Sequence, residues 1–450
     1  MTSPALWSAQ AHMPSVIGRQ LNVVSAEGAY LTPDPGARLF DGTASLWYAN
    51  IGHGREEMAQ VAYEQMKTLE VYHVFGRYTN NRAIELADKL VSIAPIDDAK
   101  VILNSGGSDS IAAALKLARR YWNHVGRPDK KVIISREGSY HGLHAYGTSI
   151  AGLDFNREGY GTESLVPDTE RVGMHDAAAF AATIERLGSE SIAAYIAEPI
   201  LGTGGVHPPQ DGYFEEIQRL CRENDILFIA DEVITGFGRT GDMFASSRYK
   251  LQPDIIAFAK GVTSGYAALG GILVAPRIWH PFFEQGVDSP IYRHGTTYSG
   301  HPVTAALALK NLEILEREGL VARSSELEQV LARELKAIES HEFVAATRVG
   351  GFLGAIELSS DVSAEFVTDQ VIEQGFITRP LRGNAVQISP PFITTDQEVR
   401  DLVGAVRAVL DAAQARTSTP RPQHESANTF SPAPGSVRRG AAKSSGFQQS

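Results

Sequence analysis

A series of short apolar runs recurs through the middle of the chain. The runs lie at residues 101–104, 132–135, 193–197, 226–230, 255–259 and 271–275. Continuous apolar runs of this length are typical of strands that are buried on both faces, and stretches with a helical pattern separate them here. The alternation predicts an α/β domain whose largely parallel sheet is covered by helices on both faces.

The pattern changes after Pro302, where a long helical stretch leads into a smaller α+β domain with strands expected within residues 348–357 and 373–392. The amino-terminal segment is expected to pack with this smaller domain and to reach the active site. The predicted organisation is therefore an amino-terminal segment at 1–54, a large domain at 55–312, a small domain at 313–416 and a tail at 417–450.

The tail is rich in Pro, Ser and Gly and has no periodicity. This composition predicts a disordered, solvated extension, with a docking segment as the alternative.

The run at 255–259 leads directly into Lys260 and Gly261. A lysine at the exit of a buried strand can lie in a desolvated pocket, and desolvation lowers the pKa of an amine so that its neutral form is available. Such an amine is suited to forming a Schiff base with a carbonyl compound. For a lone lysine, an amine that extends from the strand end into solvent would be the commoner arrangement.

Asp231 follows the run at 226–230 in the same way. Ligands of open α/β sheets bind in the crevice at the carboxyl ends of the strands. An aspartate there can keep a pyridine nitrogen protonated while a lysine forms an imine with an aldehyde, which is the arrangement that pyridoxal phosphate requires. A turn or a helix cap is the more common role of an isolated aspartate.

Two further segments fit such a cofactor. The loop Ser105–Ser108 joins the strand at 101–104 to a stretch of strong helix formers, and glycine backbone and a helix start favour a phosphate group. Tyr140 follows the strand at 132–135, where its ring can stack on a planar ligand, although Tyr140 taken alone would be a core residue.

Together these segments resemble the class III aminotransferases. The matching motifs, in order, are Gly107-Ser108, Tyr140-His141-Gly142, Asp231 to Gly241, Lys260 to Tyr266 and Thr297 to Pro302. The resemblance covers residues 20–412, and it implies the fold type I of pyridoxal-phosphate enzymes, pyridoxal 5'-phosphate as the cofactor and transamination as the reaction.

The resemblance also implies a role for each matching residue. Lys260 would carry the internal aldimine and move the proton, and Asp231 would pair with the pyridine nitrogen. Tyr140 would stack on the ring, Val233 would pack on its other face, and His141 would support the cofactor.

Gly107 and Ser108 would bind the phosphate, and Thr297 would reach the same phosphate from the neighbouring subunit. The resemblance thus implies a homodimer with shared active sites, with a tetramer as the alternative. Where the family usually shows Ser-Gly-Ser-Glu-Ala, this chain has Gly106 in place of the first serine, so Ser105 is not assigned to the phosphate. Glu198 resembles the family's second carboxylate, with a surface or capping role as the alternative.

Two residues concern the substrate. Trp47 matches the aromatic position that lines the pocket of amine and ω-amino acid transaminases, and Arg379 matches their mobile arginine. A guanidinium can bind a carboxylate through two hydrogen bonds, and its displacement makes room for an apolar amine. The alternatives are a core aromatic for Trp47 and a surface salt bridge for Arg379.

The sequence therefore predicts a transaminase that moves an amino group from an amine or ω-amino acid to a keto acid by a ping-pong mechanism. No second arginine argues for a dicarboxylate, so pyruvate is favoured over 2-oxoglutarate. An aminomutase, a racemase or a decarboxylase of the same fold is the alternative. A non-enzymatic binding protein of this fold would be expected to lack Lys260 or Asp231, and both are present.

Composition agrees with a two-domain enzyme, because 450 residues with 43% hydrophobic content can bury a large core. The net charge of −11 argues against binding to nucleic acid or to an anionic membrane. The single cysteine, Cys221, excludes an internal disulfide and is expected to be buried on a helix. No apolar run is long enough to span a bilayer, no targeting segment is visible and the histidines lack metal-ligand spacing, so we expect a cytoplasmic protein without a metal.

Overall fold

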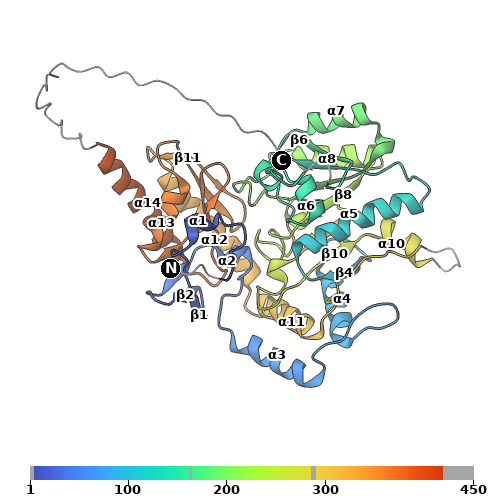
Figure 1. Ribbon diagram of the computed structural model, residues 1–450, viewed down its shortest axis with the longest axis horizontal. Coiled ribbons are helices and arrows are strands. Elements are labelled where there is room, and N and C mark those ends of the chain that lie inside the picture. The colour runs from blue at the N-terminus through green and yellow to red at the C-terminus, as the bar shows by residue number, and fades with distance from the viewer. Residues whose placement is uncertain (1–4, 162–164, 285–289, 419–450) are drawn as a thin grey trace, which may run out of the picture.

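A seven-stranded sheet forms the centre of the larger part of the molecule (Figure 1). The computed structural model describes residues 5–161, 165–284 and 290–418. The strands of the sheet lie in the order β4 (Lys100–Asn104), β10 (Gly270–Val274), β9 (Ile255–Phe258), β8 (Leu227–Asp231), β7 (Ile192–Ala197), β5 (Val132–Arg136) and β6 (Thr169–Val172). The apolar runs of the sequence thus all form strands, and the predicted fold class is confirmed.

The sheet is parallel from β9 to β6, and β10 runs antiparallel to both β9 and β4. Between β9 and β10 the chain forms only the short 3-10 helix η3 (Lys260–Val262). A strand that is parallel to its neighbour needs a longer crossover connection, which usually contains a helix. The short connection between β9 and β10 therefore returns the chain in the opposite direction. The sequence pattern did not predict β6, because this edge strand reads Thr-Glu-Arg-Val and is mostly polar.

Side chains on successive residues of the central strands enter different parts of the core. Ile133 packs in a cluster with α5 (Gly107–His124), whereas Ile134 packs with α7 (Ala177–Leu187) and α8 (Tyr213–Glu223). Because successive strand residues point to opposite faces, the helices cover both faces of the sheet. Cys221 is buried on α8, as predicted.

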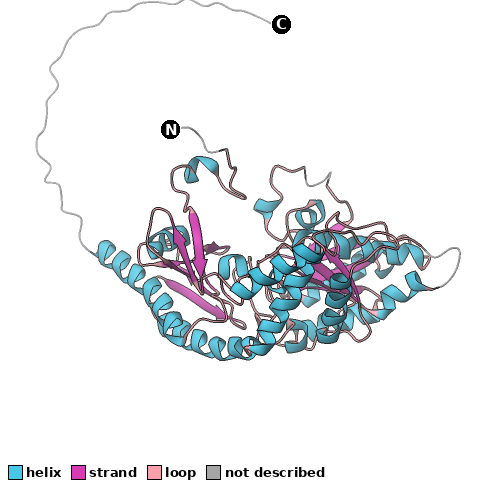
Figure 2. Cartoon of the chain, turned by 90° about the horizontal axis from the view of Figure 1, so that it is seen from below, coloured by secondary structure: helices cyan, strands magenta, loops and turns pink. Residues whose placement is uncertain are grey.

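The carboxyl-terminal part contains an antiparallel sheet and lies beside the large sheet (Figures 1 and 2). Its strands lie in the order β11 (Val344–Val349), β12 (Gly354–Leu358), β15 (Ala385–Ile388) and β14 (Pro380–Leu381). The helices that pack around it are α12 (Leu320–Ile338), α13 (Ala364–Ile372) and α14 (Asp396–Ser418). The predicted domain boundary at residue 312 falls inside α11 (Pro302–Arg317).

A third sheet joins the amino-terminal segment to the carboxyl-terminal part. Its strands lie side by side in the order β1 (Val23–Glu27), β2 (Tyr30–Pro33), β3 (Leu39–Asp41) and β13 (Phe376–Ile377). Strand β13 runs parallel to β3, with Ile377 opposite Asp41. This pairing places the segment after Asp41 next to the segment after Ile377. Those two segments contain Trp47 and Arg379.

The remaining helices connect these parts. They are α1 (Met13–Val16), α2 (Ala44–Trp47), α3 (Glu56–Thr68), α4 (Asn81–Ile93), α6 (Ala145–Ile150), η1 (Asp154–Asn156), η2 (Ser189–Ser191), α9 (Ala245–Arg248) and α10 (Pro276–Phe283). None of the helices within the described ranges is long and apolar enough to cross a membrane. Helix α14 extends to Ser418, two residues into the predicted tail, and the rest of that tail lies outside the described residues.

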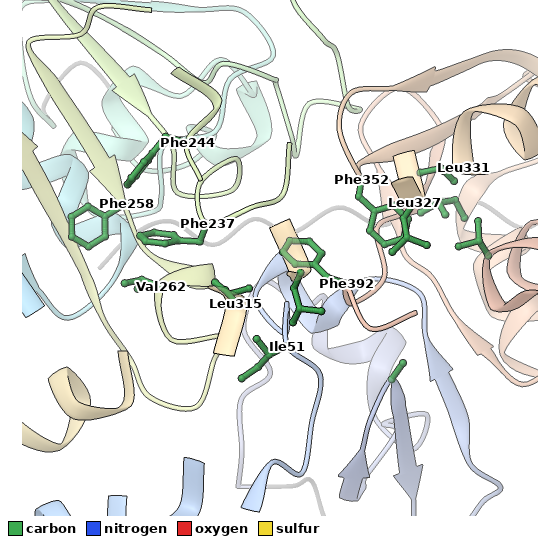
Figure 3. Packing of buried hydrophobic residues seen from close by; sticks show 14 of the residues in the cluster. Ile51, Phe237, Phe244, Phe258, Val262, Leu315, Leu327, Leu331, Phe352 and Phe392 are labelled. Atoms are coloured by element: carbon green, nitrogen blue, oxygen red, sulfur yellow. The ribbon is translucent and has the colours of Figure 1, made fainter. Parts of the chain in front are cut away.

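One hydrophobic cluster runs from the large sheet into the carboxyl-terminal part (Figure 3). It extends from Phe237 past Ile51 to Phe392 and Leu331. Arg239 is fully buried in the same region, where its guanidinium donates to the side chain of Asn50 at 2.6 Å and to the carbonyl oxygen of Pro390 at 2.8 Å. The amino-terminal segment, the large sheet and the carboxyl-terminal part therefore share one core.

Candidate active site

A cavity of about 170 Å³ opens at the carboxyl ends of the parallel strands. Asp231 is the last residue of β8, and Lys260 follows the end of β9. The cavity is lined by Gly107, Ser108, Ile111, Tyr140, His141, Gly142, Glu198, Asp231, Val233, Ile234 and Lys260. All the residues that the sequence assigned to the cofactor therefore meet here, except Thr297.

Lys260 presents its amine to this cavity from a left-handed backbone conformation, with φ at 47°. A non-glycine residue adopts this conformation only when the surrounding structure enforces it. Burial lowers the pKa of the Lys260 amine to about 8, although the nearby Asp231 carboxylate opposes this shift. A large fraction of the amine is consequently neutral in mildly alkaline solution and able to attack a carbonyl group.

The Asp231 carboxylate is held in place from two sides. Its Oδ2 atom lies 2.7 Å from Nδ1 of His141, and its Oδ1 atom accepts a hydrogen bond of 3.1 Å from the backbone amide of Val233. The other ring nitrogen of His141 is buried and has no hydrogen-bond partner among the described residues. This arrangement fixes a negative charge on the wall of the cavity.

Glu198 is a second buried carboxylate at the cavity. It accepts hydrogen bonds from the backbone amides of Tyr140 at 2.9 Å and Gly202 at 3.0 Å. Burial raises the pKa of Glu198, and the proximity of Asp231 adds to this effect. The surface role considered for Glu198 is wrong, because this side chain is buried and fixes the backbone beside the Tyr140 ring.

The amino-terminal end of α5 forms one side of the cavity. Gly106 caps this helix, and Gly107 and Ser108 are its first two residues. Backbone amides at a helix start have no acceptor within the helix and attract anions. Ser105 does not line the cavity, and its hydroxyl instead hydrogen bonds to Thr296 at 2.9 Å.

The sequence predicts that Gly142 leaves room beside the Tyr140 ring, and in the structure Gly142 lies against Ser108. Its φ is +81°, and a Cβ atom at this position would lie 2.3 Å from Oγ of Ser108. The hydroxyl of Ser108 accepts a hydrogen bond of 3.2 Å from the amide of Leu143. A side chain at residue 142 would therefore displace Ser108.

Trp47 and Arg379 lie together beside Lys260. Cζ of Arg379 is 4.0 Å from the centroid of the Trp47 ring, and Nζ of Lys260 is 5.4 Å from the same ring. Burial lowers the pKa of Arg379 to about 10, and no carboxylate pairs with its guanidinium within the described ranges. The alternative of a surface salt bridge for Arg379 is therefore wrong.

Several residues near the site gave no recognisable signal in the sequence. Asp41 is fully buried and anchors the loop that carries Trp47, and Gln387 is fully buried against Arg379. Gln10 hydrogen bonds to the Tyr140 side chain from the amino-terminal segment. Isolated polar residues of this kind become recognisable only when the fold shows that they are buried or close to the site.

Thr297 is exposed and does not line the cavity of its own chain. It lies in a segment that borders a different and larger groove, of about 860 Å³, together with the loop at residues 74–79.

Within the described parts of the chain, no group of His, Cys, Asp or Glu side chains is arranged to hold a metal ion.

Comparison with known proteins gave consistent matches. The family model for class-III aminotransferases matches residues 13–410. The chain is 36% identical over 427 residues to a diaminobutyrate–2-oxoglutarate transaminase of Halomonas elongata, covering 87% of this chain and 91% of the relative. It is 35% identical over 435 residues to a putrescine–pyruvate aminotransferase of Pseudomonas aeruginosa, covering 89% of this chain and 94% of the relative.

Solved structures of transaminases have the same fold as this chain. A transaminase from a marine Virgibacillus superposes with a TM-score of 0.87 at 37% identity, covering 92% of this chain and 98% of the other. An omega transaminase of Pseudomonas jessenii in complex with PMP superposes with a TM-score of 0.87 at 33% identity, covering 91% of this chain and 97% of the other.

Proposed function

This chain belongs to the class-III aminotransferases, which are pyridoxal-phosphate enzymes, and we propose that it transfers an amino group from an amine or ω-amino acid to pyruvate. The observation that carries the substrate assignment is the guanidinium of Arg379, which lies on Trp47 beside Lys260 without a carboxylate partner in the described structure. A cation in this position is suited to an acceptor with one carboxylate, and its aromatic neighbour is suited to an apolar amine.

The residues around the cavity fit pyridoxal 5'-phosphate. When bound, this cofactor supplies an aldehyde that condenses with amines and a ring that accepts the electron pair of a broken Cα–H bond. Gly107 and Ser108 would hold its phosphate at the start of α5, and Asp231 would face its ring nitrogen. Tyr140 and Val233 would contact its ring, and Lys260 would bind its aldehyde carbon.

Lys260 is also the group that moves the proton. Its amine takes the proton from Cα of the donor, and a pKa of about 8 allows the same nitrogen to release the proton in the next step. Asp231 is held by His141 and the Val233 amide, so that it would present its carboxylate to the ring nitrogen of the cofactor and favour a proton there.

The acceptor is proposed to be pyruvate because Arg379 provides one half-buried guanidinium for one carboxylate. The two relatives named above are described with different acceptors, one with 2-oxoglutarate and one with pyruvate. A second carboxylate on the acceptor would need a further cation, and the sequence offers no arginine whose position argues for one.

We also propose a homodimer whose two copies pair through the groove beside Thr297. Large apolar side chains are exposed on this face, including Tyr72, Phe75, Ile291 and Tyr298. Exposed apolar surface of this kind marks a protein interface. Thr297 is exposed in the segment between Gly295 and Ser299, which line this groove, and does not line the cavity of its own chain. Sedimentation of the wild-type protein and of a Phe75→Glu variant tests the proposed dimer. A monomeric wild-type protein would contradict the proposal.

The first experiment is to record the visible absorbance of the purified protein while amines and ω-amino acids are added singly without a keto acid. Loss of the yellow band with pyridoxamine phosphate left behind would establish the donor half-reaction. Pyruvate should then restore the band better than 2-oxoglutarate does. The Lys260→Ala variant is the matched control and should not undergo this cycle.

Other outcomes favour other functions. A yellow protein that no donor bleaches would favour the aminomutase, racemase or decarboxylase alternative. A protein that takes up no pyridoxal phosphate would overturn the proposed function.

A further inference from the structure

Arg379 is held by a neutral side chain. Its Nε atom donates a hydrogen bond of 2.6 Å to Oε1 of Gln387. Gln387 is fully buried on β15, and its backbone amide donates to the carbonyl oxygen of Arg379 at 3.0 Å. Main chain and side chain of Gln387 therefore both fix the arginine.

Gln387 also reaches the segment that carries Trp47. Its Nε2 atom lies 3.5 Å from the carbonyl oxygen of Thr43, at the start of the loop that leads to Trp47. Trp47 and Arg379 come from opposite ends of the chain, and the pairing of β3 with β13 brings them together. Gln387 thus lies between the two segments that supply the substrate residues.

The neutrality of Gln387 has an electrostatic consequence. An amide oxygen satisfies one donor of the guanidinium and fixes its plane, but it leaves the positive charge uncompensated. A carboxylate in the same place would neutralise the charge and compete with any carboxylate that approaches from the cavity. Among the described residues no acidic group forms an ion pair with Arg379, so the charge remains available.

We propose that Gln387 is a positioning residue that holds the Arg379 guanidinium flat on Trp47 through a neutral acceptor and so keeps its charge free for the carboxylate of the substrate. This inference rests on the proposed function, in which Arg379 binds that carboxylate. Gln387 would then help to determine specificity, because it would affect substrates that carry a carboxylate and not amines that lack one.

The decisive variant is Gln387→Glu, which keeps the size of the side chain and adds the competing charge. We expect the KM for pyruvate to rise by about tenfold or more. The KM for an amine donor that lacks a carboxylate should change by less than about twofold. The dissociation constant of butyrate, an unreactive carboxylate, should rise in parallel when measured by calorimetry. Equal changes for donor and acceptor, or no change in either, would overturn the proposal.

Gln387→Leu is the matched variant, since it removes the acceptor without adding a charge. We expect it to raise the KM for pyruvate by a smaller factor, about threefold, because the guanidinium keeps its charge but loses its anchor. If Gln387→Glu does not fold, the Leu variant is compared in wild-type and Arg379→Ala backgrounds. In the Arg379→Ala background, the Leu substitution should not change the KM for pyruvate any further. If the two substitutions instead raise this KM independently, so that their factors multiply, the proposal is overturned.

The variant Arg379→Ala separates this inference from the proposed function. If it leaves the KM for pyruvate unchanged, the carboxylate role of Arg379 fails, and the proposal for Gln387 fails with it. If it raises the KM for pyruvate and Gln387→Glu does not, only the role of Gln387 is wrong.

Discussion

Nδ1 of His141 lies 2.7 Å from Oδ2 of Asp231, and both side chains are buried at the wall of the cavity. Asp231 ends β8 and His141 follows β5, and β7 lies between these two strands in the sheet. A hydrogen bond to a buried carboxylate stabilises its charged form and fixes its direction. The orientation of the Asp231 carboxylate therefore depends on His141.

His141→Ala should weaken the binding of pyridoxal phosphate. Loss of a hydrogen bond to a charged group costs about 1.5–3 kcal/mol, which corresponds to a rise of about tenfold or more in the dissociation constant. The measurement is a titration of the apoprotein followed by absorbance. His144→Ala is the control, because this histidine is exposed and lies 3.5 Å from Asp109. Equal affinities of the His141 variant and the control would contradict the prediction.

Uptake of pyridoxal phosphate by the apoprotein should depend on pH through Lys260. Only the neutral amine reacts, and the pKa of Lys260 is lowered to about 8. The rate of appearance of the yellow band should rise by about tenfold per pH unit below pH 8 and level off above it. Stopped-flow absorbance between pH 6 and pH 10 measures this rate. A rate that still rises steeply at pH 10 would show that the lysine has an ordinary pKa.

Gly142→Ala should disrupt the phosphate side of the cavity. The new Cβ atom would lie 2.3 Å from Oγ of Ser108, and the backbone at residue 142 has φ at +81°. We expect the affinity for pyridoxal phosphate to fall by about tenfold or more, as measured by equilibrium dialysis. Gly126→Ala is a matched control, because Gly126 has φ at +80° but no atom within 4 Å of the new Cβ. A similar fall in both variants would attribute the effect to backbone strain alone.

Asp41→Asn should destabilise the loop that carries Trp47. The Asp41 carboxylate accepts hydrogen bonds from the backbone amides of Thr43 at 3.1 Å and Ser45 at 2.7 Å, and it lies 3.1 Å from Nε2 of His53. Three residues of the short, kinked helix α2 that carries Trp47, namely Ala44, Ser45 and Trp47, have positive φ. We expect the free energy of unfolding at pH 7 to fall by about 2 kcal/mol, as measured by urea denaturation.

The effect of Asp41 should also depend on pH. Burial alone would raise the pKa of Asp41, but the hydrogen bonds from His53 and Thr43 outweigh burial and lower it. The stabilisation is therefore present above the unfolded pKa of about 3.9 and is lost as the pH falls through the folded pKa. The difference in stability between wild type and Asp41→Asn should be present at pH 5 and shrink as the pH falls below about 4. Asp361→Asn, at an exposed position, should show no such difference.

Much of the fold and the cofactor site followed from the sequence because their signals are local. A buried strand appears as a continuous apolar run, and the residue that ends it, such as Asp231 or Lys260, is visible in the same few letters. The phosphate cup at Gly107 and Ser108 is likewise a short turn before a helix. These residues lie at the carboxyl edge of one sheet, so finding the strands was enough to predict that they meet.

Only the tertiary structure decided the arrangement around the substrate. The antiparallel direction of β10, the edge strand β6 and the pairing of β3 with β13 are choices between strand neighbours, which apolar runs do not encode. The contact of Trp47 with Arg379 and the hold of Gln387 on that arginine join residues from opposite ends of the chain. Local sequence determines which segments are strands and which residues end them, because backbone propensity and burial act over a few residues. Which distant polar side chains then meet depends on how the sheets pair and pack, and that is a property of the whole folded chain.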